Sequence, residues 1–496
     1  MPICNGDNAL NISEKRSFRP GTHTALASLV SSTQDLRAVG MDTSTDTRTR
    51  YVFQQNPDLL QCSKTAAQWI ELLQWQNVGR GSWLSESDRK GRTVTMIEAG
   101  DLFKRIPGTI LFFVQLANAT GDARYLRIAA RGADLLMTTW RNLVDSAGNS
   151  SPFGLNLSFS GGLAGVAYVL NETGKAAGNH TFREASRAVT DSIVRDAKSV
   201  GSGFAWSEAP GITGDGGIVL YLLYAAREFD CSLYGITAQK AGDHILEIAN
   251  SVRHGGFNWS GFPAFPGLSI NAYMPGFEDG SAGITYLFAR LFSETKKSRY
   301  LFAARQGALY LERFAAQDNL TALTIDPLQE PRDAQYSGFC HGPAGTARAF
   351  VELYKITCEP IFQAQAERLA QAFLQRGDLN NRTPEPRNTL CQCCGSVATI
   401  DHFIDMWATT GRLDFLAIAQ RAARQLVSRE ENLYGTGNRK LPLWPPVKPW
   451  DICAQSSYEA RAAGVGTALL RVHLAEQGRY GSILRLDNPS VQHRRA

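Results

Sequence analysis

Hydrophobic and polar positions alternate with a helical period along most of the chain. The segments YLRIAARGADLLM from Tyr125, YLFAARQGALYLERF from Tyr300 and FLAIAQRAARQLV from Phe415 place apolar residues three and four positions apart. This spacing puts the apolar side chains on one face of a helix. Residues 1–60 lack the period and contain the polar, Ser/Thr-rich runs SSTQD and MDTSTDTRTR. We therefore expect helices after residue 60 and a flexible arm before it.

A short glycine pattern precedes a helical segment seven times, at intervals of 52 to 68 residues. Six of the seven segments share a glycine at the aligned position, and the sixth segment has Ala398 there. The aligned glycines are Gly108, Gly165, Gly217, Gly283, Gly345 and Gly466. Five segments carry a second glycine three positions earlier, namely Gly162, Gly214, Gly280, Gly342 and Gly395. Such small residues allow a tight turn and a helix that starts close to its neighbours.

Each repeat consists of a turn, a helix, a loop and a second helix. This order predicts an all-α fold, an α/α toroid built as a double-layer barrel of about seven helical hairpins with G-x-x-G turns. An open superhelical solenoid is the alternative, but the long loops and the shared repeat phase of the chemically rich positions favour a closed barrel. We expect three parts: an arm over residues 1–60, the barrel over 61–485 and a basic tail over 486–496.

The composition narrows the classes of function. Hydrophobic residues make up 44% of the chain and charged residues 20%, and no run of eighteen apolar residues could span a membrane. The first residues lack the apolar core of a signal peptide, so we expect a cytoplasmic protein with reduced thiols. The net charge of +5 is modest and the arginines are scattered, which gives no support for a nucleic-acid partner.

Five of the nine cysteines fall between residues 340 and 394. The motifs GFCHGPAG and CQCCGSVAT occupy the same place in the fifth and sixth repeats, so a ring would bring Cys340, Cys393 and Cys394 together. Three thiolates are ligands that select zinc, and a catalytic zinc site keeps one position open. We therefore predict a Zn²⁺ site with these three ligands. Cys391 is expected to be a neighbour of the site.

These motifs resemble those of the LanC-type lanthionine cyclases and of the cyclase domains of lanthipeptide synthetases, from about Ile106 to Gln477. That family is an α/α toroid of seven helical pairs, with zinc held by the cysteine of a W-C-x-G segment and a Cys-His pair in a later C-H-G segment. FCHGPAG is similar to the first segment, with Phe339 in place of tryptophan. CCGSVATIDHF is similar to the second, with Cys394 in place of histidine. The resemblance thus implies the three-cysteine shell of the Cys-Cys-Gly subgroup.

The resemblance implies a carbon–sulfur bond-forming activity in lanthipeptide (lantibiotic) biosynthesis. A peptide cysteine, held as thiolate by zinc, would add to dehydroalanine or dehydrobutyrine and form lanthionine or methyllanthionine. The expected substrate is a dehydrated ribosomal precursor peptide. Because the chain has no kinase motifs and no dehydrating module, we expect a separate dehydratase or kinase/lyase partner.

The addition needs a proton donor near the zinc. His341, next to a ligand, is the first candidate. Asp279, where the family often has histidine, is the second, and His402 is the third. Each has a structural alternative: His341 could orient a neighbour, Asp279 could cap the helix near Gly283, and His402 could be packed inside the barrel.

Three aromatic residues have both a substrate-binding and a structural interpretation, and three further cysteines have a structural one. Trp206, Trp259 and Phe262 lie in loops that would rim the toroid, where they would contact a peptide or pack in the core. Three further cysteines are expected to be small buried residues near helix ends or loops: Cys231, Cys358 and Cys453.

Three alternative functions remain open. Eukaryotic relatives of the family are similar to enzymes that add glutathione to dehydroamino acids in proteins. A non-catalytic helical scaffold that binds peptides would also use zinc, with Cys391 or His341 as a fourth ligand. Glycosidases and epimerases share α/α toroids, but they have acidic centres, and paired carboxylates at a matching repeat phase are not evident in this sequence.

Overall fold

All residues that the structure describes belong to one unit of the chain, Pro57–Ala496, the second of two into which the chain divides. The computed structural model describes residues 57–76, 86–87, 93–94, 106–150, 157–207, 209–253, 255–259, 275–317, 339–340, 342–375, 396–432 and 462–479. Among these residues, no helix combines the length and the apolar character that a membrane crossing requires.

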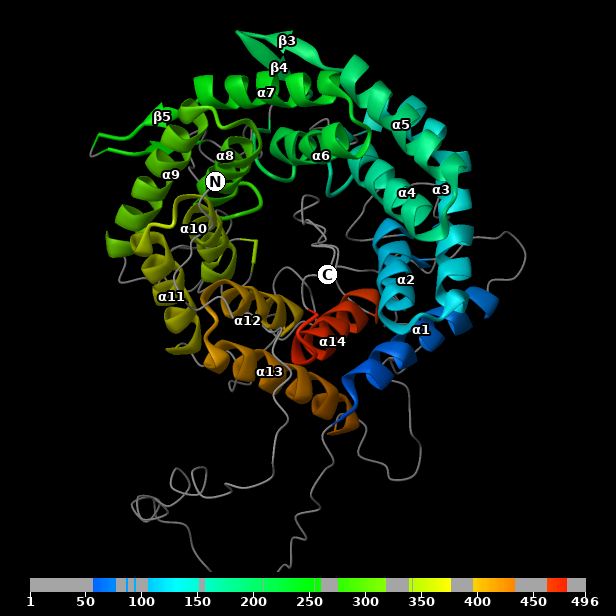
Figure 1. Ribbon diagram of the computed structural model, residues 1–496. Helices are drawn as coiled ribbons and strands as arrows, with labels where there is room; N and C mark the ends of the chain where they lie inside the picture. Colours follow the sequence, from blue (N-terminus) through cyan, green and yellow to red (C-terminus); the bar gives the residue numbers. More distant parts are fainter. Residues whose placement is uncertain are drawn as a thin grey trace, which may run out of the picture. The chain divides into compact units, whose positions relative to one another are not determined.

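The helices of this unit form two concentric layers, which Figure 1 shows in the plane of the ring. The inner layer consists of α2 (Ile106–Thr120), α4 (Leu163–Ala177), α6 (Asp215–Glu228), α8 (Ser281–Thr295), α10 (Pro343–Thr357), α12 (Ser396–Thr410) and α14 (Ala462–Glu476). The outer layer consists of α1 (Leu59–Gln76), α3 (Ala123–Ser150), α5 (His180–Arg195), α7 (Ser232–Glu247), α9 (Ser298–Gln317), α11 (Pro360–Gln375) and α13 (Leu413–Asn432). Each inner helix from α2 to α12 is joined to the next outer helix by a short turn. The predicted α/α toroid is thereby confirmed.

Within the described residues, three short antiparallel hairpins lie in the connections from an outer helix to the next inner helix. The hairpins are β1 (Glu86–Ser87) with β2 (Thr93–Val94), β3 (Lys198–Val200) with β4 (Gly203–Ala205), and β5 (Asn250–Ser251) with β6 (Phe257–Asn258). The pairing register of β3 and β4 sets Ser199 opposite Phe204. All three connections therefore lie at the end of the ring where the inner helices begin.

The aligned glycines of α6, α8 and α10 are required because the preceding turn folds back over the start of each of these three helices. A Cβ atom on Gly283 would lie 1.9 Å from the carbonyl oxygen of Phe277, and one on Gly345 would lie 1.9 Å from that of Phe339. Real Cβ atoms do not approach an oxygen so closely. The earlier glycine of the pattern serves as the N-cap residue of α4, α6, α8 and α10, at Gly162, Gly214, Gly280 and Gly342.

The outer helices repeat a pattern of one aromatic and several small residues on the face that packs inward. The buried aromatic residues are Tyr125, Phe182, Tyr234, Tyr300, Phe362 and Phe415. The buried small residues four positions later are Ala129, Ser186, Ala238, Ala304, Ala366 and Ala419. Small residues let the two layers approach closely: a Cβ atom on Gly242 of α7 would lie 2.6 Å from a methyl carbon of Leu291 in α8.

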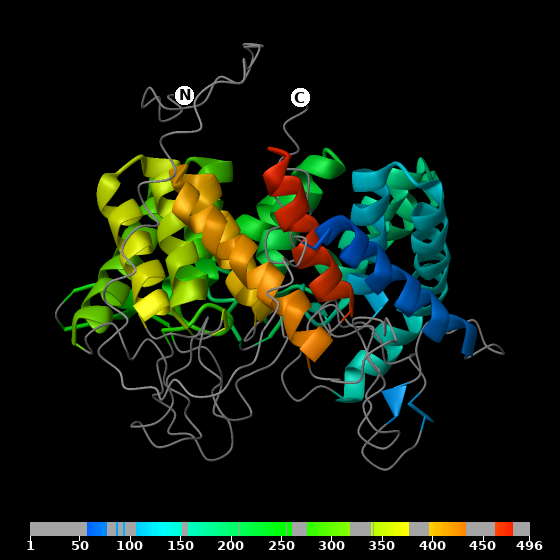
Figure 2. The ribbon, with the colours of Figure 1, turned by 90° about the horizontal axis from the view of Figure 1, so that it is seen from below.

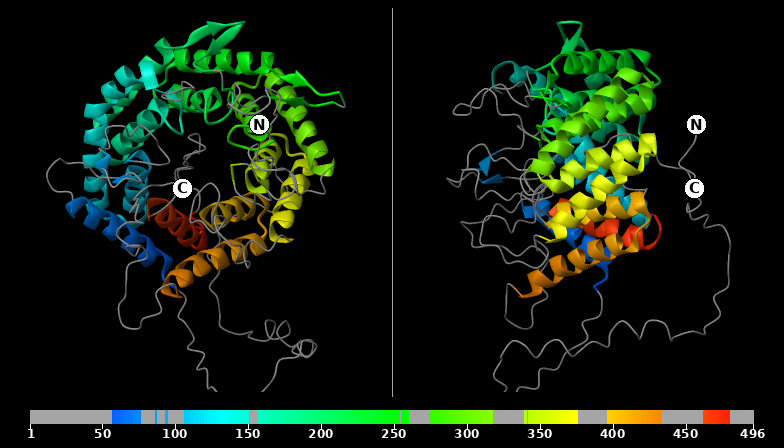
Figure 3. Two further views of the ribbon diagram at one scale, coloured as in Figure 1. Left: turned by 180° about the vertical axis from the view of Figure 1, so that it is seen from behind. Right: turned by 90° about the vertical axis from the view of Figure 1, so that its left-hand side faces the viewer.

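Helix α1 closes the ring by packing on α14, from the other end of the sequence. Its residues Leu59, Ser63, Ala67 and Ile70 are buried and have the spacing of the inward face of the other outer helices. The Ser63 hydroxyl donates a hydrogen bond of 2.9 Å to the carbonyl of Gly466 in α14. Figure 2 shows α1 in blue beside α14 in red, and Figure 3 shows the same closure from behind.

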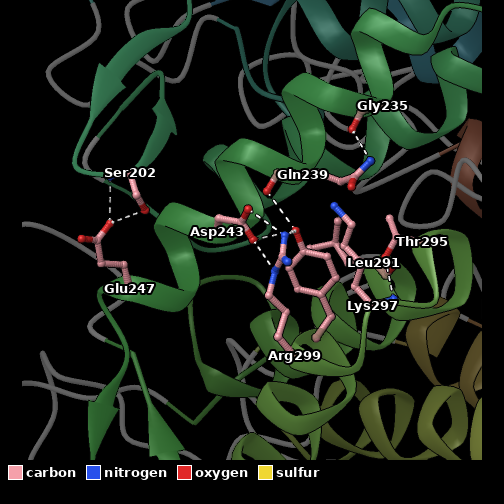
Figure 4. A network of polar contacts seen from close by, with 10 residues as sticks. Ser202, Gly235, Gln239, Asp243, Glu247, Leu291, Thr295, Lys297 and Arg299 are labelled. Carbon is pink, nitrogen blue, oxygen red and sulfur yellow. Dashed lines mark hydrogen bonds and ion pairs between the residues drawn. The ribbon is translucent and has the colours of Figure 1, made fainter.

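Neighbouring outer helices are also joined by polar contacts, which Figure 4 shows for α7 and α9. Arg299 of α9 donates from Nε and from a terminal nitrogen to the carboxylate of Asp243, at 2.8 and 2.9 Å. The hydroxyl of Tyr300 donates to the same carboxylate at 2.8 Å. One turn further along α7, Glu247 accepts bonds from the backbone and the hydroxyl of Ser202 beside β3. These contacts fix the hairpin and α9 to one helix.

Six connections between inner and outer helices contain a residue with a positive φ at the same repeat position. These residues are Gly121, Gly178, Asp230, Lys296, Cys358 and Gly411, with φ between 48° and 72°. A left-handed residue after a helix is the usual position of a C-terminal glycine. Lys296 therefore holds a conformation that costs a residue with a Cβ atom about 1–2 kcal/mol.

We predict that Lys296→Gly raises the free energy of unfolding by about 0.5–1 kcal/mol, because relief of the left-handed strain exceeds the added flexibility of glycine in the unfolded chain. The matched control is Gly178→Ala. A Cβ atom there would meet no atom within 4 Å, so its expected loss of about 1 kcal/mol comes from the backbone alone. Urea unfolding midpoints measure both, and a lower midpoint for Lys296→Gly would contradict the prediction.

Candidate functional site

The turns that precede α6, α8 and α10 are joined to one another by backbone hydrogen bonds. The N–H groups of Phe277 and Glu278 both donate to the carbonyl of Cys340, at 2.8 and 3.1 Å. The N–H of Thr213 donates to the carbonyl of Glu278 at 3.2 Å. Three consecutive repeats thus present their turns as one connected surface at the end where the inner helices begin.

Asp279 lies in the middle turn and is buried, with 8% of its surface exposed. Its carboxylate accepts a hydrogen bond from the hydroxyl of Thr213 in the neighbouring turn. The N-cap residue of α8 is Gly280, so Asp279 is not the N-cap residue of this helix. Its carboxylate instead contacts the turn of the adjacent repeat. Thr213 was not foreseen from the sequence, because its role depends on a partner 66 positions away.

Cys340 lies three residues before the start of α10 and is also buried, with 5% exposed. Its sulfur is in no disulfide. The other predicted ligands, Cys393 and Cys394, lie outside the described residues, as do His341 and Cys391. Within the described ranges, no group of three or more His, Cys, Asp or Glu side chains is placed to hold a metal ion. The zinc ligand set therefore stays a prediction.

Helix α12, which follows Cys393 and Cys394 in the sequence, is a neighbour of α10 in the inner layer. It begins at Ser396, two residues after Cys394. Cys340 and the Cys393–Cys394 pair therefore precede the starts of two adjacent helices that point the same way.

The two tryptophans of the predicted rim are structural. The indole nitrogen of Trp206 donates to the carbonyl of Ile193 at 2.7 Å, and that of Trp259 donates to the carbonyl of Ile245 at 2.9 Å. Both rings are buried, which decides between the two interpretations in favour of packing. Phe262 lies outside the described residues. The repeated segments GFAW and GFNW, each at the end of a hairpin, could have indicated this equivalence from the sequence.

His402 is packed between the layers. Its ring lies 5.0 Å from that of Phe403 and 6.2 Å from that of Phe373 in α11. Burial lowers the pKa of His402 to about 4, although the carboxylate of Asp405 opposes this shift. Its Nε2 atom has no hydrogen-bond partner within the described part of the chain. A neutral imidazole in this position serves packing, as the structural alternative expected.

Asp215, the first residue of α6, is a buried carboxylate that the sequence did not single out. It accepts hydrogen bonds from the N–H of Trp206 at 3.2 Å and from the N–H and hydroxyl of Ser207 at 3.0 and 2.8 Å. Burial raises the pKa of Asp215 to about 6, against these hydrogen bonds. The residue holds the end of the β3–β4 hairpin over the start of α6.

Two further cysteines, Cys231 and Cys358, lie at helix ends but are not fully buried. Cys231 is the N-cap residue of α7 and Cys358 follows α10 in a left-handed conformation, and both are half-buried. The expectation of small buried residues is therefore wrong for these two. Cys358 is disulfide-bonded in the structure, which differs from the expectation of reduced thiols, whereas Cys231 is free. Cys453 lies outside the described residues.

The fold is a double-layer ring of helical hairpins, and one of its glycine turns carries a buried thiol. The protein is therefore an α/α toroid with a candidate thiol site. A profile of the lanthionine synthetase C-like protein family matches residues 97–442, which is more than half of the chain. The chain belongs to this family.

One of three similar solved structures, a nisin cyclase, supports the fold. A nisin cyclase aligns with a TM-score of 0.53 and 14% identity over 84% of this chain and 94% of its own. The Lin0763 protein from Listeria innocua aligns with a TM-score of 0.47, 11% identity and coverages of 85% and 99%. A GH76 α-mannanase from Bacteroides thetaiotaomicron aligns with a TM-score of 0.42, 14% identity and coverages of 86% and 97%. At such identities the likeness concerns the fold alone. No curated protein matched the chain.

We predict opposite pH dependences of stability from Asp215 and His402. The raised pKa of Asp215 stabilises the fold below about pH 4, and this contribution is lost as the pH rises through about 6. The lowered pKa of His402 stabilises the fold above about pH 6.5, and this contribution is lost as the pH falls towards 4. Each shift of about two units corresponds to on the order of 3 kcal/mol.

Urea midpoints between pH 4 and pH 7 separate the two groups. Asp215→Asn should remove the loss of stability on raising the pH, so that the variant gains stability over this range. His402→Phe, which keeps the aromatic packing, should remove the loss on lowering the pH. A variant that keeps the pH slope of the wild-type protein would show that its residue does not titrate as described.

Proposed function

We propose that this protein is a zinc-dependent cyclase that joins cysteine thiols of a dehydrated ribosomal peptide to dehydroalanine and dehydrobutyrine residues. The products are lanthionine and methyllanthionine thioether rings. The observation that carries the proposal is the buried Cys340, on a turn hydrogen-bonded to the turn of the buried Asp279, in a member of the lanthionine synthetase C-like family.

The residues present fit a zinc ion. The sulfur of Cys340 is a soft donor in a buried position, and adjacent inner helices start just after Cys340 and just after Cys394. Cys393 and Cys394 would complete a three-thiolate shell, which leaves one position for a substrate thiol. When bound, zinc would lower the pKa of that thiol below its ordinary value of about 8.5 and keep it as the nucleophilic thiolate.

The reaction forms one bond and moves one proton. The substrate sulfur bonds to the β-carbon of the dehydro residue, the carbon–carbon π electrons move to the α-carbon and its carbonyl, and a proton then completes the α-carbon. No group leaves. His341 and Asp279 are the residues proposed to deliver that proton, and the Thr213 hydroxyl holds the Asp279 carboxylate in place.

The proposed partners follow from the chemistry of the substrate. Dehydro residues must be made before they can be cyclised, so a dehydratase or a kinase/lyase has to act on the same peptide first. We propose that both enzymes work in the cytoplasm, where the substrate thiols stay reduced.

We predict one zinc ion per chain in the wild-type protein and its loss in each of Cys340→Ala, Cys393→Ala and Cys394→Ala. Zinc content and circular dichroism are measured together, so that loss of metal is separated from loss of fold. Cys391→Ala is the matched control and should keep its zinc. A wild-type protein that takes up no zinc after supplementation would refute the ligand set.

The same proteins are then given a dehydrated precursor peptide, and ring formation is followed by protection of the peptide thiols from alkylation. The three ligand variants should lose at least a hundredfold in rate. A parallel reaction contains free glutathione and a dehydrated peptide without cysteine. Addition of glutathione with no ring formation would favour the glutathione-adding function, and neither product from a zinc-loaded protein would favour a binding scaffold.

We predict that Asp279→Asn lowers kcat by about 10²–10⁴ if its carboxyl delivers the proton, since this is the usual contribution of a general acid. Asparagine keeps the size of the side chain and can still accept the Thr213 bond. Thr213→Val, which leaves the carboxyl but removes one of its donors, should have a smaller effect. Equal kcat values for Asp279→Asn and the wild-type protein would assign the proton to another group.

A further inference from the structure

Arg348 of α10 is a buried arginine whose guanidinium lies against three aromatic rings. Its central carbon is 5.7 Å from the ring centre of Phe277, 5.5 Å from that of Tyr286 and 5.5 Å from that of Phe339. Only 8% of the residue is exposed. Such distances place a cation within reach of the negative face of each ring, an attraction that strengthens away from water.

The three rings come from three different elements. Phe277 lies in the turn before α8, Tyr286 in α8 itself and Phe339 in the turn before α10. The rings also pack on each other, with 4.8 Å between the centres of Phe277 and Phe339 and 5.4 Å between those of Phe277 and Tyr286. Through Arg348, helix α10 therefore contacts two turns and the neighbouring helix α8.

An arginine is unusual at this position of the repeat. The equivalent residues of the other inner helices are Leu111, Tyr168, Leu220, Tyr286, Asp401 and Leu469. A buried cation requires compensation. Glu352, one turn further along α10, forms its ion pair with Arg290 at 2.7 Å, and its charge also interacts with that of Arg348. The pKa of the Glu352 carboxyl is lowered: burial alone would raise it, but the charges of Arg290, Lys355 and Arg348 outweigh burial. Because a guanidinium stays protonated in proteins, Arg348 places a positive charge at a position where three other inner helices have leucine.

The two turns that Arg348 contacts carry the two residues of the candidate site. Phe339 immediately precedes Cys340, and Phe277 lies two residues before Asp279. The backbone N–H groups of Phe277 and Glu278 donate to the carbonyl of Cys340, so the turns share two hydrogen bonds as well as the packed rings. Any shift of Phe339 against Phe277 would therefore change the spacing of Cys340 and Asp279.

We propose that Arg348 is a positioning residue of the candidate site, which fixes the turn of Cys340 against the turn of Asp279 through the rings of Phe339 and Phe277. This inference rests on the proposed function for its chemical meaning. The planar guanidinium contacts several rings at once, which the point charge of a lysine cannot do, and a methionine would fill the space without the attraction.

The test compares Arg348→Met and Arg348→Lys with Leu220→Met in the full-length, metal-free protein. Leu220 is buried at the same repeat position of α6. Its replacement therefore introduces the same side chain away from the three aromatic rings that surround Arg348. Two readouts report on the turns: hydrogen exchange of the Phe277 and Glu278 amides, and alkylation of Cys340 by iodoacetamide, both followed by mass spectrometry. The urea midpoint monitors the fold.

In Arg348→Met we expect the two amides to exchange at least tenfold faster and Cys340 to be alkylated at least tenfold faster. Arg348→Lys should lie between this variant and the wild-type protein, and Leu220→Met should match the wild-type protein. A folded Arg348→Met protein with wild-type exchange and alkylation overturns the inference. If Arg348→Met does not fold, Arg348→Lys decides: a rise in exchange of at least threefold supports the inference, and wild-type exchange overturns it.

These readouts need neither zinc nor substrate, so they fail independently of the proposed function. A protein without cyclase activity whose two amides respond to Arg348→Met would refute the function and keep the mechanical role of Arg348. In an active enzyme, a positioning role further predicts that Arg348→Met lowers kcat more than it raises KM, since the catalytic groups are displaced and the substrate contacts are retained.

Discussion

The close approach of a backbone carbonyl to the starts of α6, α8 and α10 is the constraint on which this part of the barrel depends. The carbonyl of Phe277 fills the space that a side chain at residue 283 would need, and the side chain of Phe277 reaches the next repeat, 2.7 Å from where a Cβ atom of Gly345 would lie. Each turn is thereby held between its own helix and the following one. Because the candidate site is built from such turns, the position of Cys340 is linked to the packing of several repeats.

The repeat could be predicted from the sequence because its physical cause is local. A glycine is needed where the turn crosses the starts of α6, α8 and α10, although α12 has Ala398 at the aligned position, and the helical period of apolar residues is visible along the chain. Closure by α1 could not be predicted in the same way. Leu59, Ser63, Ala67 and Ile70 carry the spacing of an outer helix, but they lie at the edge of the polar segment, and their partner helix is about four hundred residues away.

The residues of the candidate site likewise include some that the local sequence marks and others that it does not. Cys340 and Asp279 could be found because they occupy distinctive places in the repeat, and the structure puts both in buried, connected turns. Thr213, Asp215 and Arg348 were missed because each acts through a partner in another segment, and nothing in their own sequence surroundings marks them. The tryptophans differ, since their identical place in GFAW and GFNW could have indicated a shared packing role from the sequence.

The ribosome makes the chain from its N-terminus. Closure of the ring by α1 and α14 therefore sets the order in which the barrel can be completed. Helix α1 leaves the ribosome early, but α14, on which its apolar face packs, follows about four hundred residues later. At about 5–20 residues per second, this interval lasts roughly 20–80 s. During that time the apolar face of α1 and the open edge of the unfinished ring lack their partner. A cell that makes this protein must therefore shield both surfaces until synthesis is nearly complete.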